Sequence, residues 1–177
     1  MQYKKMNFSA LPGFQAAFLK QPHETYLSMQ IGDGEVVAAP GQNEELRELP
    51  QGVSVYHTGH NGGTIVGFPG SITLFAFTNR ANAPQWREQL AAYLQSKGLD
   101  AVVVDNDVLV DGFKVAGFMS KWMNRNIQYF GCHISIRVDL DMIQRICRKP
   151  MVKIPKGLGD YGITREMVLE ALDITEV

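Results

Sequence analysis

The sequence lacks three features, each of which would have pointed to a particular class of protein. Positive charge is not in excess, because 17 basic side chains face 18 acidic ones, and this excludes binding driven by bulk positive charge, including to nucleic acid. Only two cysteines occur, Cys132 and Cys147, too few for a disulfide-stapled scaffold. The N-terminus has no apolar run of the kind a signal peptide needs. We therefore expect a reduced, cytoplasmic protein with a single domain over residues 1–177.

Charge is also missing from one long stretch of the chain. From Leu49 to Asn79 there is no Asp, Glu, Lys or Arg. A membrane span is excluded there, because the prolines and glycines of the stretch would leave backbone groups unsatisfied in lipid. We interpret it as two buried strands, Val53–His57 and Ile72–Phe77, joined by a glycine-rich loop.

The rest of the chain predicts helices mixed with strands. Expected helices lie around residues 11–18, from Pro84 to a left-handed cap at Gly98, from an Asp139 cap to about Lys149, and after a Thr164 cap. Expected strands are Tyr26–Ile31 in a hairpin with Val36–Ala39, Ala101–Val104, Val108–Val110 in a hairpin with Phe113–Gly117 across Asp111-Gly112, and His133–Val138. The predicted fold class is α+β, with a mixed, largely antiparallel sheet flanked by helices.

The first candidate for chemistry is the glycine-rich loop Asn61-Gly62-Gly63-Thr64. Glycines allow backbone amides to approach a ligand closely, so such a loop can hold a carboxylate or a phosphate. It is not a phosphate-binding Walker loop, because no Gly-Lys-Ser/Thr follows. A connection without function is the alternative, and the histidines and glycines gathered in the uncharged stretch favour a site.

The second candidate is Asn106-Asp107 together with Lys114. A two-residue turn at Asp111-Gly112 places Lys114 across from Val108 or Leu109 and within reach of Asp107. A lysine among apolar neighbours suits the neutralisation of an oxyanion or phosphate. The alternative is a solvent-exposed lysine, which is the usual position of this residue type.

Other reactive side chains give weaker patterns. The histidines and cysteines lack zinc-site spacing, so no metal site is expected, and Cys132 is interpreted as a small buried residue. The five cations within residues 145–156 are interpreted as a solvated helix end, with binding of an acidic partner as the alternative.

Four segments together resemble the biotin/lipoate protein ligase family, specifically its lipoate ligase and octanoyltransferase branch. Asn61–Ile72 is similar to the glycine loop of that family, and Cys132–Leu140 to its His-Gly strand and the segment that follows it. Lys153–Leu158 resembles the loop that closes over the adenylate. The most specific match is Asn106–Gly117, which reads NDVLVDGFKVAG.

The resemblance implies a class II synthetase-like catalytic domain. Such a domain activates lipoate, biotin or a fatty acid with ATP and magnesium as an acyl-adenylate, and passes the acyl group to a lysine amine of a carrier domain. Lys114 would be the catalytic lysine, and Asn106 with Asp107 would bind the nucleotide or its magnesium. The implied substrate- and nucleotide-binding residues are Gly62, Gly63, Thr64, Ile65, Val66, Asn106, Asp107, Ala116, Gly117 and His133.

The chain also departs from the family pattern. Relatives that make adenylates carry two arginines just before the glycine loop, where this chain has His57 and Thr58. No cysteine occupies the position of the octanoyltransferase nucleophile. Three functions therefore stay open: an ATP-dependent ligase, an acyltransferase that uses a preformed thioester, and a non-catalytic module that binds a ligand or a protein.

Overall fold

A computed structural model describes residues 1–18, 20, 23–31, 36–39, 49–57, 65–148 and 150–177. Its helices are α1 (Leu11–Phe18), α2 (Trp86–Ser96), α3 (Leu140–Ile146) and α4 (Arg165–Ala171). Its strands are β1 (Gln2–Asn7), β2 (Thr25–Gln30), β3 (Val36–Ala39), β4 (Ser54–His57), β5 (Ile65–Gly67), β6 (Ile72–Thr78), β7 (Ala101–Val104), β8 (Asp107–Val110), β9 (Phe113–Trp122), β10 (Gln128–Ile134) and β11 (Thr175–Glu176). No helix of the described segments is long and apolar enough to cross a membrane.

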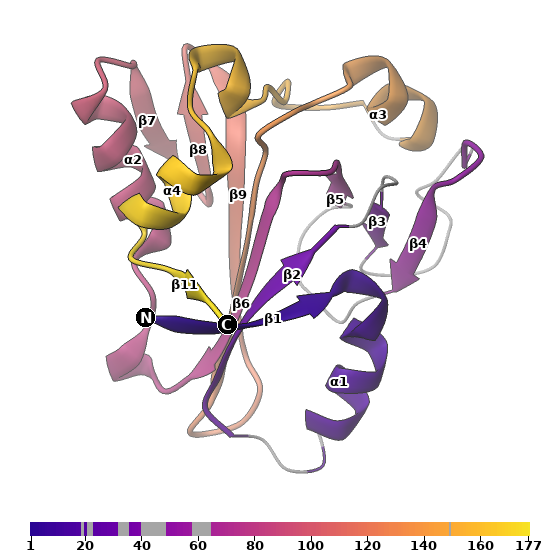
Figure 1. Ribbon diagram of the computed structural model, residues 1–177, viewed down its shortest axis with the longest axis vertical. Helices are drawn as coiled ribbons and strands as arrows, with labels where there is room; N and C mark the ends of the chain where they lie inside the picture. The colour runs from indigo at the N-terminus through magenta and orange to yellow at the C-terminus, as the bar shows by residue number, and fades with distance from the viewer. Residues whose placement is uncertain (19, 21–22, 32–35, 40–48, 58–64, 149) are drawn as a thin grey trace.

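The strands form one large and one small sheet (Figure 1). The large sheet has the order β11-β1-β2-β6-β10-β9-β8-β7, and the small one the order β4-β3-β5. From β2 to β7 every neighbouring pair of the large sheet is antiparallel, whereas β1 runs parallel to both β2 and β11. The mixed, largely antiparallel sheet predicted from the sequence is confirmed.

β6 lies near the centre of the large sheet, and all of its residues are buried. Successive side chains of a strand point to opposite faces of the sheet, so the side chains of β6 belong to two separate cores. Ile72, Leu74 and Ala76 pack with α2 and α4 on one face. Phe75 and Phe77 pack with α1 on the other. A strand enclosed on both faces has no place for a charged side chain, which explains the absence of charge from β6. The other strand expected to be buried, Val53–His57, is not, because Ser54 is exposed and Val55 and Tyr56 are only partly buried.

The small sheet and α3 lie on the same face of the large sheet as α1. Tyr56 of β4 and Ile65 of β5 pack against the core that contains α1. Val66 of β5 and Ile143 of α3 belong to a third, smaller core. Side chains of the large sheet that point to this face therefore point toward the small sheet, and those on the other face point toward α2 and α4.

Most predicted elements are confirmed. α2 is followed by Gly98 in the left-handed region, with φ of +80°. Asp111 and Gly112 have φ of +51° and +82° and join β8 to β9. The helix caps also form, because the side chains of Asp139 and Thr164 accept hydrogen bonds from backbone N–H groups at the starts of α3 and α4.

Two expectations about strands are wrong. β2 and β3 are not a hairpin, because β2 pairs with β1 and β6 in the large sheet while β3 pairs with β4 and β5. The strand expected at His133–Val138 is Gln128–Ile134, because the aromatic residues before Gly131 pair with β6 and β9. The strands β1, β5 and β11 are absent from the sequence-based expectation, since pairing rather than local pattern defines them.

β7 forms an edge of the large sheet, and side chains of α2 cover its two ends. Gln95 donates a hydrogen bond to the carbonyl of Ala101 at 2.7 Å, and Arg87 donates one to the carbonyl of Asp105 at 2.8 Å. Between these points the side chains of Val102, Val103 and Val104 are exposed.

A buried carboxylate fixes the opposite edge, where the C-terminal strand β11 lies beside β1. Glu176, whose side chain is 10% exposed, accepts hydrogen bonds from Ser28 and Arg165 and forms an ion pair with Lys5 at 3.3 Å. Burial would raise the pKa of this carboxyl, but the bonds from Arg165, Ser28 and Lys5 outweigh it and lower the pKa to about 2. The network ties together four elements, β1, β2, α4 and β11.

We expect Glu176→Gln to lower the free energy of unfolding at pH 7 by about 1–2 kcal/mol. The folded-state pKa lies below the ordinary value of 4.5, so the stabilisation is present above that pH and is lost as pH falls toward 2. Denaturant titrations at several pH values measure this, with the exposed Glu170→Gln as the control. A difference between wild type and Glu176→Gln that does not shrink below pH 4 would contradict the expectation.

Candidate functional site

Four neighbouring strands place a row of paired residues on the face that looks toward the small sheet. Asp107 of β8 pairs with Gly117 of β9, Gly117 with His133 of β10, and His133 with Thr73 of β6. Directly paired residues project to the same face of a sheet. The sheet order thereby brings together residues that are far apart in the sequence.

A β-bulge adds Lys114 to this row. Val108 pairs with Ala116 and Leu109 with Lys114, so Val115 is an extra residue in β9 without a partner in β8. Lys114 and Gly117, three positions apart, would lie on opposite faces of a regular strand; the extra residue returns them to the same face. Of the two partners predicted for Lys114, Val108 and Leu109, the structure shows Leu109. Because Leu109 and Asp107 are two positions apart in β8, this pairing places Lys114 on the face of Asp107, and the bulge keeps Gly117 on that face too.

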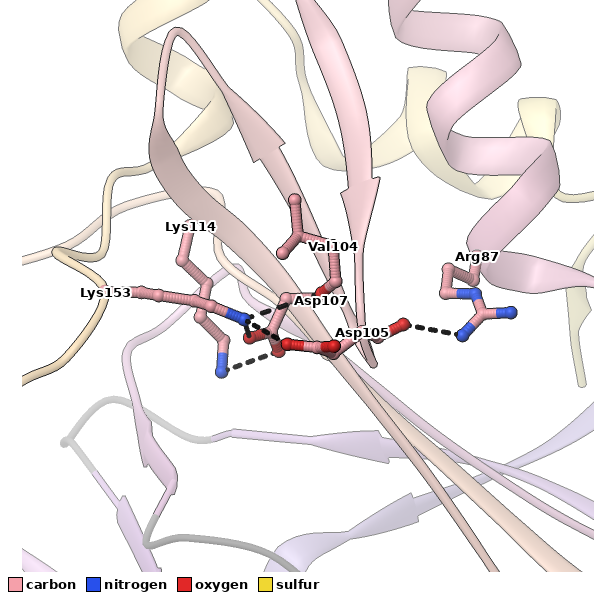
Figure 2. A network of polar contacts seen from close by, with 6 residues as sticks. All are labelled: Arg87, Val104, Asp105, Asp107, Lys114 and Lys153. Carbon is pink, nitrogen blue, oxygen red and sulfur yellow. Dashed lines mark hydrogen bonds and ion pairs between the residues drawn. The ribbon is translucent and has the colours of Figure 1, made fainter.

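Asp107 lies between two lysines (Figure 2). Its Oδ1 is 2.9 Å from Nζ of Lys114, and its Oδ2 is 2.7 Å from Nζ of Lys153. Burial would raise the pKa of the Asp107 carboxyl, but hydrogen bonds and charge from Lys153 and Lys114 outweigh it and lower the pKa. The carboxylate stays ionised, and the three side chains together carry one net positive charge.

Gly117 provides the space that this ion pair fills. A Cβ atom at that position would lie 3.1 Å from Nζ of Lys114 and 3.4 Å from Oδ1 of Asp107. The contact with the ammonium is tighter than an ordinary van der Waals distance, so a larger residue would push the end of the Lys114 side chain away by a few tenths of an ångström. Gly117, the last residue of the NDVLVDGFKVAG segment, thus leaves room for the side chain of Lys114 in the same segment.

The segment that carries Lys153 is held against β9 by its backbone. The N–H of Lys114 donates to the carbonyl of Ile154, and the N–H of Lys156 donates to the carbonyl of Lys114, both at 2.9 Å. Gly157 then passes so close to Ile136 that a Cβ would lie 2.4 Å from its carbonyl oxygen. Lys153 therefore reaches Asp107 from a fixed backbone.

Expecting the basic segment to be a solvated helix end is wrong for two of its cations. α3 ends at Ile146, and Lys153 forms the ion pair with Asp107. The ammonium of Lys156 lies 4.5 Å from the ring centroid of Tyr161 and 5.1 Å from that of Phe113. The ion pair of Lys153 with Asp107 is not predicted from the sequence. The only sequence feature that pointed to Lys153 is the similarity of Lys153–Leu158 to a loop that closes over the adenylate.

His133 contributes a partly buried imidazole to the row. Its Nδ1 is 2.9 Å from Oγ1 of Thr73, which is fully buried. Its Nε2 is shielded from solvent and has no hydrogen-bond partner among the described residues. Burial, and then the charge of Lys114, lowers the pKa of His133 to about 4. The ring is therefore neutral near pH 7, with one nitrogen oriented by Thr73 and the other without a protein partner in the described part of the chain.

The other predicted site residues lie in different places. Ile65 and Val66 are strand residues of β5, where the side chain of Ile65 packs against the core on the same face as His133. Asn106 is an exposed turn residue whose carbonyl accepts a hydrogen bond from Phe118 at 2.7 Å. The side chain of Ala116 does not join the site, because it is buried in the core on the opposite face. Gly62, Gly63 and Thr64, with Thr58, lie outside the described residues.

The cysteines take no part in the site. Cys132 is a free, buried thiol in the core that contains α2, and burial raises its pKa above the ordinary value. Its interpretation as a small buried residue is confirmed, and its neighbour His133 points to the opposite face as strand geometry requires.

The residues present do not fit a magnesium ion on Asp107. Both carboxylate oxygens are already bound by ammonium groups. Among the residues that the structure describes, no group of three or more His, Cys, Asp or Glu side chains could hold a metal ion. We therefore derive no chemical step through a metal at this carboxylate.

Comparison of the whole structure with solved structures gives extensive fold similarity at low sequence identity. A bi-partite lipoate protein ligase from Thermoplasma acidophilum, described with its E2 lipoyl domain, superposes with a TM-score of 0.70 at 14% identity, covering 100% of this chain and 86% of that one. A lipoate-protein ligase A bound with ATP gives 0.72 at 13% identity, covering 100% and 90%. This chain has the lipoate-protein ligase fold.

The biotin ligases share the same fold to a lesser degree. A biotin protein ligase from Aquifex aeolicus, in complex with biotin and ATP, gives a TM-score of 0.54 at 13% identity, covering 97% of this chain and 66% of that one. No family model and no curated protein matches the sequence. The expected class of catalytic domain is thus confirmed at the level of fold, where the similarity stops.

We expect Gly117→Ala to shift the Lys114 ammonium and weaken its ion pair with Asp107 while the sheet stays intact, because the added Cβ crowds the end of a flexible side chain. The free energy of unfolding should change by less than about 1 kcal/mol. Competitive acetylation measured by mass spectrometry should show Lys114 reacting several-fold faster relative to Lys97. Gly13→Ala, whose Cβ meets nothing within 4 Å, is the control. Unchanged Lys114 reactivity in Gly117→Ala would contradict this account.

The neutral ring of His133 predicts a specific pH dependence of stability. Its folded-state pKa of about 4 lies below the ordinary 6.5, so between these values the unfolded chain binds a proton that the folded chain does not. This residue's contribution to stability should fall as pH decreases from 6.5 to 4. Denaturant titrations should show the stability deficit of His133→Gln against wild type shrinking over that interval, and a deficit that stays constant from pH 6.5 to pH 4 would contradict this expectation.

Proposed function

We propose that this protein is an acyl-acid ligase or acyltransferase that activates a carboxylic acid and passes the acyl group to an amine. The observation that supports this most is the Lys114 ammonium, 2.9 Å from Asp107, on a sheet whose fold is that of lipoate-protein ligases. It lies in the segment with the most specific family resemblance, and the bulge and Gly117 direct it to one face.

The proposed ligase reaction has two steps. In the first, a carboxylate oxygen of the acid attacks the α-phosphorus of ATP, and pyrophosphate leaves. In the second, an amine nitrogen attacks the acyl carbon, AMP leaves, and the nitrogen loses a proton. Negative charge develops on phosphoryl and carbonyl oxygens in these steps, and a pre-oriented ammonium stabilises it. Lys114 has that role in the proposal.

His133 would bind an oxygen of the same ligand. The 2.9 Å contact between Nδ1 and Oγ1 of Thr73 fits either tautomer of the ring. In the proposal the Thr73 hydroxyl donates to Nδ1, so the proton of the neutral ring lies on Nε2. Nε2–H then has no protein acceptor among the described residues and can donate to a carboxylate or phosphoryl oxygen. A buried polar atom without a partner is costly, which supports a ligand as its partner.

Substrate and acceptor are inferred by analogy with proteins of the same fold. Among the ligases of that fold, the biotin protein ligase is in complex with biotin and ATP, and the lipoate-protein ligase A is bound with ATP. The bi-partite lipoate protein ligase is described with its E2 lipoyl domain. We therefore propose lipoate, biotin or a fatty acid as the substrate and ATP as the co-substrate. A lysine of a small carrier domain would be the acceptor.

The test is formation of an acyl-adenylate from radiolabelled ATP with lipoate, octanoate or biotin, in wild type and Lys114→Met. We expect wild type to form product with at least one acid and Lys114→Met to lose about 100-fold or more in rate, because one pre-oriented charge is removed. Lys97→Met, at the end of α2 on the other face of the sheet, should retain full activity.

Absence of adenylate would shift the conclusion to one of the two other functions. Transfer from an acyl-carrier thioester to an amine, again dependent on Lys114, would identify an acyltransferase. If neither reaction occurs but calorimetry shows binding of the free acid, the protein is a non-catalytic binding module and the proposed catalysis is overturned.

A further inference from the structure

The ammonium of Lys153 lies among three oxygen atoms of the β7–β8 turn and its neighbours (Figure 2). Its Nζ is 2.7 Å from Oδ2 of Asp107, 3.5 Å from the carbonyl oxygen of Val104 and 3.6 Å from Oδ2 of Asp105. Carboxylate and carbonyl oxygens are the ligands that hard divalent cations prefer in proteins. The turn thus presents oxygens suited to a cation, and Lys153 supplies the cation.

We propose that Lys153 is the resident cation of this site, occupying the place beside Asp107 that a divalent metal ion would otherwise take. The site then binds its anionic ligand through protein ammonium groups, with no metal ion on Asp107.

The charges around Asp107 support this assignment. Its two oxygens already have one ammonium each, so a divalent ion approaching the carboxylate would meet two positive charges within a few ångströms. Asp105 offsets little of that charge, because its side chain is 84% exposed and screened by solvent. A metal ion could bind only after Lys153 had left.

The structure also opposes the departure of Lys153. The carbonyl of the next residue, Ile154, is bonded to Lys114 of β9, and the N–H of Lys156 is bonded back to Lys114. The hydrogen bond to Asp107 is the main cause that raises the pKa of Lys153 above its ordinary value. The side chain therefore stays charged wherever the carboxylate is ionised.

The consequence for catalysis rests on the proposed function. When Lys114 turns from Oδ1 of Asp107 toward a ligand, Oδ2 keeps its bond to Lys153. The half-buried carboxylate is then not left without a counter-charge, which would be strongly unfavourable. Lys153 is thus a positioning residue that makes Lys114 available.

The test is a titration with Mn²⁺ alone, which prefers the same oxygen ligands as Mg²⁺ and whose free form is followed by electron paramagnetic resonance. Wild type and Lys153→Arg, which keeps a cation, should show no site that depends on Asp107. Lys153→Ser should gain one site, bound about tenfold or more tightly than any in wild type, and the additional change Asp107→Asn should abolish it. Lys97→Ser is the control, and thermal unfolding verifies that each variant is folded.

Two results of this titration would overturn the proposal. One is a Mn²⁺ site in wild type that disappears in Asp107→Asn. The other is a folded Lys153→Ser variant that gains no site. Neither depends on catalytic activity, so the titration decides the proposal even if the proposed function fails.

A second measurement addresses the ligand, with an acyl-sulfamoyl adenosine as a stable mimic of the acyl-adenylate. Wild type should bind this mimic with the same affinity in EDTA and in Mg²⁺. Lys153→Ser should bind it about tenfold more weakly than wild type in EDTA, and Mn²⁺ should restore part of the lost affinity. Wild-type binding that disappears in EDTA would overturn the proposal. No wild-type binding under either condition would instead count against the proposed function.

Discussion

One extra residue in β9 keeps Lys114 and Gly117 on the same face of the large sheet. Without Val115, the residues that follow the Asp111-Gly112 turn would alternate in step with β8, and Lys114 and Gly117 would project to opposite faces. With the bulge, Val115 and Ala116 both pack in the core with α2. The side chain of Lys114 passes over Gly117, which has no side chain, and reaches the carboxylate of Asp107. The apolar core and the charged site are therefore two results of the same irregularity, and neither could change register without disrupting the other.

The site is assembled across strands rather than along the sequence. Its side chains come from β6, β8, β9, β10 and the segment after α3, which meet only because β6 and β10 bring the chain back beside β9. The hydrogen bonds that hold them differ in kind. Thr73 orients the neutral ring of His133, whereas two ammonium groups hold Asp107. In the proposed function, a ligand that spans these positions meets one donor from a neutral ring and one from a cation, which suits the joined carbonyl and phosphoryl groups of a mixed anhydride.

The parts of this arrangement that the sequence predicts are the local ones. The turn at Asp111-Gly112, the cap at Asp139 and the pairing of Lys114 with Leu109 follow from residue types at fixed spacing, and each is confirmed. The false hairpin of β2 and β3 shows the limit, because turn residues near two strands do not determine which sheet each strand enters. Lys153 was missed as a partner of Asp107 for the same reason, since 46 positions separate them and no spacing rule connects residues that pair through tertiary structure.

The covered ends of β7 have a consequence for the behaviour of the protein in solution. A strand edge with three exposed valines has the composition that recruits other chains into intermolecular sheets. Arg87 and Gln95 already occupy carbonyls at the two ends of that strand, so an incoming strand would have to displace both side chains before it could pair along the full length. These two side chains of α2 thus oppose the pairing of another strand with β7, and a change that shortens both would leave the carbonyls of Ala101 and Asp105 open to an incoming chain.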